Sequence, residues 1–349
     1  MRVVFMGTPA FATPSLRALI DGPDDVVAVV TQPDRPKGRH GVLTPPPVKV
    51  LAQQYNIPVY QPEKVKDKGF LLQLKALNPD VIVVVAYGQI LSRDILDIPP
   101  RWCINIHASL LPEYRGSAPI NWALINGEKV TGVTSMIVSE TLDSGPVLLK
   151  KEVAIGEDDD VNALHDKLSK AGGELLSETM NGIRKGDLTP VQQNESEATY
   201  FPMLEKSDGL IDWHKTAEEI RNRIRGLNPW PGTYTYLQRQ GPGVRGQGPG
   251  VMLKIFKADV VGGQLIEPTP PNPLFIKEGG PKAGALAVES GQPPKIPGTV
   301  LEVNNKGIIV AAGEGYLSVK ELQLEGRRRM VVAEFIRGHK IEKGMALGS

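Results

Sequence analysis

Residues 103–112 read CINIHASLLP, a short strand-like run that ends in a turn-forming segment. Because side chains alternate between the two faces of a strand, Asn105 and His107 are predicted to share one face with Cys103, with the two isoleucines on the other. Two polar side chains therefore lie together where the strand ends. The apolar residues on both faces predict a sheet that is covered by helices on each side.

The segments around this run repeat an alternation of strand-like and helix-like patterns. RVVFM, DVVAVVT, DVIVVVA and TGVTSMIV are further predicted strands, and PVKVLAQQY, FLLQLKAL, APINWALING and VNALHDKLSKAGGELLSETMNGIRKG carry apolar residues at helical spacing. This order is typical of a parallel sheet with crossover helices. We predict an α/β domain over residues 1–190.

The pattern changes after a polar linker, residues 191–206. TYTYL, MLKIFKADVV, GTVLEV, GIIVAA and YLSVKELQL follow without regular helices between them, which predicts a small β-barrel or β-sandwich over residues 207–349. The helix AEEIRNRIRGL is expected to open this domain and to end at Asn228-Pro229. Residues 262–296 are rich in Pro and Gly and are expected to form a long surface loop.

Length and composition agree with an ordinary globular protein of two domains. The chain has 349 residues, of which 41% are hydrophobic and 23% charged, and no apolar run approaches the roughly 20 residues of a membrane-spanning helix. The N-terminus lacks the pattern of a signal peptide, so we expect a soluble, cytoplasmic protein. The net charge of +1 gives no global attraction to nucleic acid, so any such contact must be local.

Two common cofactor classes find no support in the sequence. One cysteine and histidines without ligand spacing leave a metal site unsupported. Residues 241–246, GPGVRG, match the dinucleotide-binding pattern literally, but they lack the strand before and the helix after that this pattern requires. There is no Walker A motif either, and we expect neither a metal nor a nicotinamide cofactor.

The polar pair at the strand end is the strongest candidate for chemistry. Ligands of open parallel sheets bind beyond the carboxyl ends of the strands, where Asn105 and His107 are placed. The alternative is that the pair only satisfies buried backbone groups. Asp143, in ETLDSGPVL, taken alone is best interpreted as a turn residue, although a carboxylate near His107 would orient its ring. Cys103 lies deeper in the strand and is a poor candidate for a nucleophile.

Four segments in this order, TQPDRPKGR, NIHASLLPEYRGSAP, LDSG and LNPWPG, closely resemble the folate-dependent formyltransferase family, in particular the members that formylate methionyl-tRNA. The resemblance covers nearly the whole chain. It implies a Rossmann-like catalytic domain, an OB-like C-terminal barrel that binds tRNA, and no metal; a monomer is expected. The implied reaction moves the formyl group of 10-formyltetrahydrofolate to the amino group of methionine on initiator tRNA, for translation initiation.

The resemblance also assigns residues. It makes Asn105, His107 and Asp143 the catalytic trio, in which Asn105 can donate a hydrogen bond to the developing oxyanion. His107 can either donate to the same oxygen or move the amine proton, and both roles stay open. The expected folate contacts are Ser109, Leu110, Leu111, Pro112, Tyr87, Gly88 and Ile90, and the expected tRNA contacts are Arg35, Lys37 and Arg39.

Three alternatives remain. A folate-dependent formyltransferase acting on an amino-sugar nucleotide, or a formyltetrahydrofolate hydrolase, would share the Asn-x-His and Ser-Leu-Leu-Pro elements, but would not need the basic loop or the NPWPG segment. A noncatalytic RNA-binding protein would need neither Asn105 nor His107, and their clustering argues against it.

Overall fold

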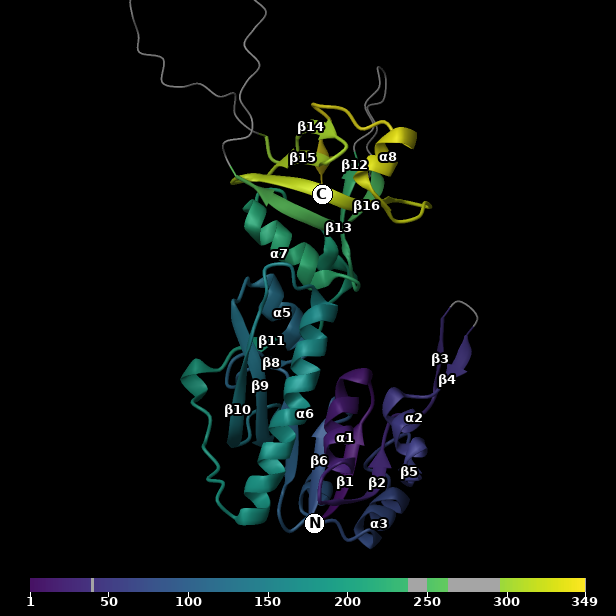
Figure 1. Ribbon diagram of the computed structural model, residues 1–349, viewed down its shortest axis with the longest axis vertical. Helices are drawn as coiled ribbons and strands as arrows, with labels where there is room; N and C mark the ends of the chain where they lie inside the picture. The colour runs from purple at the N-terminus through teal and green to yellow at the C-terminus, as the bar shows by residue number, and fades with distance from the viewer. Residues whose placement is uncertain (39–40, 238–249, 263–295, 349) are drawn as a thin grey trace, which may run out of the picture. The chain divides into compact units, whose positions relative to one another are not determined.

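The computed structural model describes residues 1–38, 41–237, 250–262 and 296–348 (Figure 1). Two compact units divide the chain, Met1–Leu204 and Glu205–Ser349. The predicted surface loop at 262–296, apart from its two end residues, and the GPGVRG segment lie outside the described residues.

The first unit is built on a seven-stranded sheet in the order β10-β9-β7-β6-β1-β2-β5. Its strands are β1 (Arg2–Gly7), β2 (Asp25–Val30), β5 (Val59–Tyr60), β6 (Val81–Val85), β7 (Cys103–His107), β9 (Val130–Ile137) and β10 (Val147–Ala154). The pairs from β5 through β7 are parallel, whereas β9 runs antiparallel to both β7 and β10. The α/β class is as predicted. Strand β10 was not predicted, because VLLKKEVA carries the charges of a half-exposed edge strand.

Helices cover both faces of this sheet (Figure 1), as the apolar strands predicted. One core cluster joins Val3, Val83 and Ile104 to helices α1 (Thr13–Ile20), α2 (Pro47–Gln54) and α6 (Val161–Lys185). The other joins Val4, Ile82 and Cys103 to α3 (Lys68–Ala76) and α4 (Arg93–Leu96). The smaller elements of the unit are η1 (Ala10–Ala12), β3 (Arg35–Lys37), β4 (Val42–Thr44), β8 (Arg115–Gly116), α5 (Pro119–Ile125), η2 (Glu195–Glu197) and β11 (Tyr200–Phe201).

Gly132 of β9 has no room for a side chain. A Cβ there would come within 2.3 Å of the Lys151 carbonyl oxygen and 2.5 Å of Leu110 Cδ2. Because a backbone oxygen in a paired strand cannot move aside, Gly132→Ala is expected to lower the free energy of unfolding by about 1–3 kcal/mol, measured by chemical denaturation. Gly338→Ala, at the end of α8, adds a Cβ with no heavy atom within 4 Å outside its own helix and chain neighbours, and should not lower the denaturation midpoint. Equal midpoints for the two variants would contradict this packing argument.

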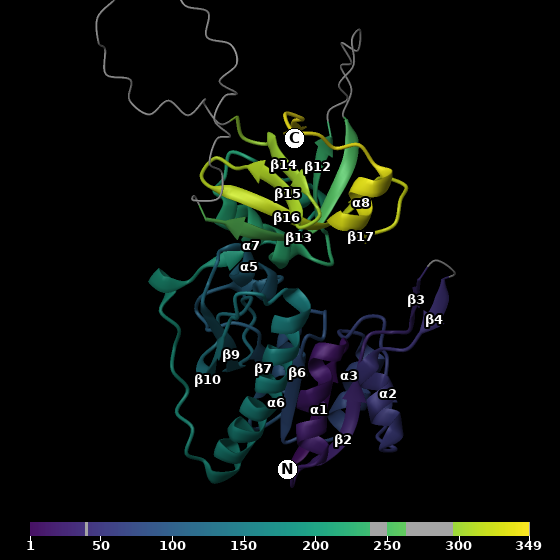
Figure 2. The same ribbon diagram turned by 45° about the horizontal axis from the view of Figure 1, so that its top comes forward.

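The second unit holds a curled antiparallel sheet in the order β14-β15-β16-β13-β12-β18, with β17 paired to β16 (Figure 2). Its elements are η3 (Lys206–Gly209), α7 (Ala217–Leu227), β12 (Thr233–Leu237), β13 (Val251–Val261), β14 (Val300–Asn304), β15 (Gly307–Ala311), β16 (Tyr316–Leu324), β17 (Met330–Val331), α8 (Val332–Gly338) and β18 (Leu347–Gly348). The expected helix is α7, which begins with a capping box of Thr216 and Glu219 and ends before Asn228. It packs on β13 and β16 over a separate core.

In the part of the chain that the structure describes, no helix is both long and apolar enough to cross a membrane.

Candidate active site

Strand β7 carries Asn105 and His107 to the carboxyl end of the parallel part of the sheet. Ile104 and Ile106 enter one core cluster and Cys103 the other, so the side chains alternate as predicted. Asn105 is half-buried and His107 is 8% exposed. Burial raises the pKa of Cys103 to about 12, so its thiol stays protonated at neutral pH and packs as part of the core.

The His107 ring is held on one side by Ser109. Its Nδ1 lies 3.0 Å from the Ser109 hydroxyl, which itself donates a 2.7 Å hydrogen bond to the Glu113 carbonyl oxygen. Since the only hydroxyl hydrogen of Ser109 is used on Glu113, Ser109 must accept from His107, and Nδ1 carries the proton. In the neutral ring the free lone pair is therefore on Nε2.

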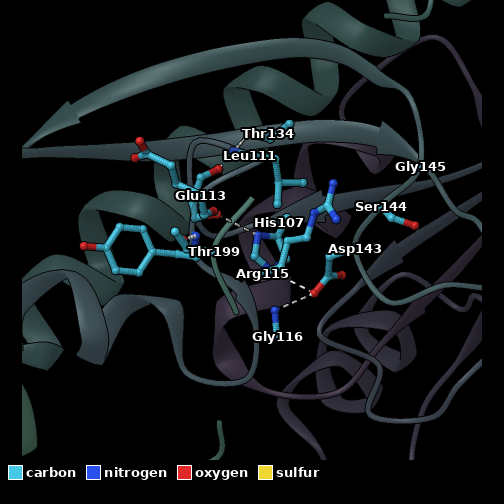
Figure 3. Close-up of polar contacts among 12 residues, drawn as sticks. His107, Leu111, Glu113, Arg115, Gly116, Thr134, Asp143, Ser144, Gly145 and Thr199 are labelled. Carbon is cyan, nitrogen blue, oxygen red and sulfur yellow. Dashed lines mark hydrogen bonds and ion pairs between the residues drawn. The ribbon is translucent and has the colours of Figure 1, made fainter. Parts of the chain in front are cut away.

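Asp143 faces this free nitrogen. Its Oδ2 lies 3.3 Å from His107 Nε2 and accepts a 2.9 Å hydrogen bond from the Gly116 backbone N–H (Figure 3). Burial of the carboxyl group opposes ionisation, but the hydrogen bond and charge of the protonated His107 ring, the Gly116 N–H and the charge of Arg115 together hold the pKa of Asp143 below its usual value. The structure thus brings a carboxylate against the histidine, where the sequence pattern alone favoured a turn residue.

The segment after β7 is fixed by Thr134 of β9. The Thr134 hydroxyl donates to the Ser109 carbonyl oxygen at 2.7 Å and accepts from the Leu111 N–H at 3.1 Å. The side chains of Ser109 and Leu111 are fully buried, whereas Leu110 and Pro112 are half-buried. Of the four expected folate contacts in this segment, only Leu110 and Pro112 present partly accessible side chains.

The other expected folate contacts follow strand β6. Tyr87 is 2% exposed, its hydroxyl has no hydrogen-bond partner among the described residues, and burial raises its pKa to about 12. Its carbonyl oxygen accepts from the Thr8 hydroxyl at 2.9 Å. Gly88 adopts a positive φ of 90°, and the Ile90 side chain is 82% exposed. Of the Tyr87 and Ile90 side chains, only that of Ile90 is open to a ligand.

The expected tRNA-binding loop is a short hairpin, β3 paired with β4. Arg35 lies on β3, with its guanidinium 3.2 Å from Glu63. Lys37 ends β3, and Arg39 lies outside the described residues. Lys49 Nζ binds Asp34 at 2.9 Å and Gln61 at 2.7 Å, which ties the base of the hairpin to α2 and to the residue after β5.

Sequence reasoning did not select Arg115, Thr134 or Gln193, although all three hold parts of this site. Arg115 and the following glycine stand in the quoted YRGSAP motif. The motif indicated that these residues matter but not what they do. Gln193 stands in a polar run that reads as a linker. Among the described residues, no three His, Cys, Asp or Glu side chains cluster as metal ligands would.

A helix-covered α/β sheet with a His–Asp pair at a strand end, followed by a curled antiparallel sheet, is the architecture of the formyl transferases. Residues 1–180 match the family model described as "Formyl transferase", and residues 203–340 match "Formyl transferase, C-terminal domain". Two solved structures share the fold. One is WlaRD, a sugar 3N-formyl transferase crystallised with dTDP and 5-N-formyl-THF. It matches with a TM-score of 0.61 at 17% identity, and the match covers 94% of this chain and 99% of that one. The N-formyltransferase from Helicobacter canadensis, with folinic acid and dTDP-3-aminofucose, has a TM-score of 0.59 at 16% identity, covering 91% and 98%.

Curated relatives are similar over the full chain. "Methionyl-tRNA formyltransferase" of Citrifermentans bemidjiense is 46% identical over 348 residues, 100% of this chain and 96% of that protein. The protein of the same name from Caldanaerobacter subterraneus subsp. tengcongensis is 48% identical over 99% of this chain and 100% of its own length. The chain belongs to the methionyl-tRNA formyltransferase family.

Proposed function

We propose that this protein transfers the formyl group of 10-formyltetrahydrofolate to the amino group of methionine on initiator tRNA, in the cytoplasm. The observation that carries the proposal is the similarity of the whole chain to methionyl-tRNA formyltransferases. The His107–Asp143 pair at the end of β7 adds a group able to accept a proton from an amine.

The hydrogen bonds of His107 favour the role of general base. Nδ1 is protonated and tied to Ser109, so Nε2 is the nitrogen that can take the proton from the attacking amine. The ionised Asp143 then stabilises the imidazolium at 3.3 Å. As the new C–N bond forms and the bond from the formyl carbon to the folate nitrogen breaks, Nε2 returns the proton to that leaving nitrogen.

Asn105 is proposed to donate its amide N–H to the formyl oxygen, where negative charge develops in the transition state. The folate is proposed to lie against Leu110, Pro112 and Ile90, with the backbone of Ser109, Leu111, Tyr87 and Gly88 completing the contact. Only side chains with accessible surface can contribute apolar area, so the buried residues are proposed to contribute backbone contacts.

The identity of the formyl acceptor distinguishes the proposed function from the alternative functions. We would supply the purified chain and formyl-labelled 10-formyltetrahydrofolate with methionyl initiator tRNA, methionyl elongator tRNA, a dTDP-amino sugar, or no acceptor. Label is expected on methionine of the initiator tRNA. Formylation of the sugar alone, or release of formate without an acceptor, would reject the proposal. If formyl were not transferred or released under any of the four conditions, an RNA-binding role would be favoured.

Arg35, Lys37 and Arg39 are proposed to contact tRNA phosphates, with the second unit adding further contacts. Lys37→Ala and Arg39→Ala should each raise the KM for tRNA and leave the KM for folate unchanged, because only the tRNA carries a phosphate backbone. Each should also reduce the slope of log(kcat/KM) against log salt by about 1. Lys185→Ala removes an exposed charge at the end of α6 and serves as the control. Equal salt slopes in all three variants would remove the hairpin from the tRNA contacts.

A further inference from the structure

The segment 191–202, here called the strap, is bound to the first unit along its length, although its sequence predicted a linker. Val191 exchanges two backbone hydrogen bonds with Val147, at 2.8 and 2.9 Å. At the other end β11 pairs in parallel with β8, and Phe201 stacks on Tyr114 with ring centroids 4.8 Å apart. The Trp122 indole donates to the Pro202 carbonyl oxygen at 3.0 Å. The strap is therefore a structural part of the catalytic unit.

A buried cation, Arg115, faces the middle of the strap. Its side chain is fully buried, and its guanidinium binds the Glu195 carboxylate through two hydrogen bonds of 2.8 and 2.9 Å. The same guanidinium donates to the Tyr200 hydroxyl at 2.5 Å and to Gln193 Oε1 at 2.8 and 3.1 Å. An arginine has only donors, so it fixes which end of the Gln193 amide faces it.

The opposite end of that amide reaches the loop that carries Asp143. Gln193 Nε2 donates to the Asp143 carbonyl oxygen at 2.8 Å and to the Gly145 carbonyl oxygen at 2.7 Å. Both amide hydrogens are thus used on this loop. Arg115 orients the amide, and the amide holds the loop.

The loop needs such support because Asp143 has an unfavourable backbone conformation. Its φ is 51°, in the left-handed region that costs a non-glycine residue energy unless its surroundings impose it. At Gly145 a Cβ would come within 1.8 Å of the Ile137 carbonyl oxygen, so this turn is packed tightly against β9. The carboxylate itself is held by the N–H of Gly116, the residue next to Arg115.

We infer that Gln193, oriented by Arg115, is a positioning residue that fixes the Asp143 carboxylate against His107 Nε2. The inference rests on the proposed function. It gives the strap a role in catalysis beyond joining two units, since the strap supplies the amide that holds the backbone of a residue 50 positions earlier.

The test compares the same substitution at two adjacent glutamines. Gln193→Met replaces the amide with an apolar chain of similar length, whereas Gln192→Met makes this change on an exposed side chain. Misplacing a reacting group costs roughly 10- to 100-fold in rate, so Gln193→Met is expected to lower kcat by that factor with both KM values nearly unchanged. Gln192→Met should retain the kcat of the unaltered protein. Gln193→Glu tests the two ends of the amide separately, because it keeps an acceptor for Arg115 but removes the donors to the loop. This variant should remain folded and have a lower kcat.

A double-mutant cycle separates positioning from general stability. In the Asp143→Asn background, Gln193→Met should lower kcat further by less than about threefold, because the effects of substitutions at residues that act as one unit are not additive. An unaltered protein that does not formylate methionyl-tRNA would reject the proposed function. An active protein in which folded Gln193→Met keeps full kcat, raises only KM, or adds its full loss to that of Asp143→Asn would overturn the positioning role alone.

Discussion

Asn105→Ala is expected to lower kcat by about 10²–10³, because removing one hydrogen-bond donor from a developing oxyanion typically has that cost. Asn105 lies at the end of β7 on the same face as His107, and its backbone stays paired with Val84 and Met136 when the side chain is shortened. The fold should therefore survive. Single-turnover formyl transfer with both substrates saturating would measure the loss free of binding effects.

The control for Asn105→Ala lies two residues earlier on the same strand face. Cys103→Ala shortens a buried side chain whose thiol takes no part in the proposed reaction, and kcat should stay within about threefold, as for a site that affects packing alone. Turnover near that of the unaltered protein in folded Asn105→Ala would remove Asn105 from the oxyanion contact.

The sequence could predict Asn105 and His107 because strand geometry has a fixed period of two. Once CINIH is assigned as a strand of a parallel sheet, the shared face and the carboxyl-end position follow from local rules. The same reasoning predicted the apolar strands with helices on both faces. These features depend on short-range pattern alone, and the structure agrees with them.

Asp143 and Gln193 could not be placed by such rules. The proximity of Asp143 to His107 depends on β9 running antiparallel beside β7 and on a left-handed turn after it, neither of which leaves a periodic signal. Gln193 acquires its contacts from the buried guanidinium of Arg115, 78 residues away in sequence. Long-range polar contacts of this kind have no sequence spacing, so only the family resemblance suggested Asp143 and nothing suggested Gln193.

Asp143→Asn is expected to lower kcat by about 10²–10⁴, the range typical of lost general acid–base assistance. The neutral amide cannot stabilise the imidazolium that forms when His107 Nε2 takes the amine proton. An amide that turns its NH₂ group toward Nε2 would also occupy the lone pair that the reaction needs. Single-turnover rates would measure the loss, and kcat within about tenfold of the unaltered protein would contradict the pairing of Asp143 with the base.

Stability against pH gives a second readout of the same carboxylate, and its sign is fixed by the direction of the pKa shift. Burial raises the pKa of Asp143, but His107, Gly116 and Arg115 outweigh it and leave the pKa below the ordinary value of 3.8. A carboxyl whose pKa is lower in the folded state stabilises the fold above its unfolded pKa, and this contribution disappears as the pH falls through the folded value. The difference in unfolding free energy between the unaltered protein and Asp143→Asn should therefore shrink below about pH 4. A difference that grows with acidity would mean that folding raises the pKa of Asp143, which would contradict the electrostatic support that the proposed proton transfer takes from this carboxylate.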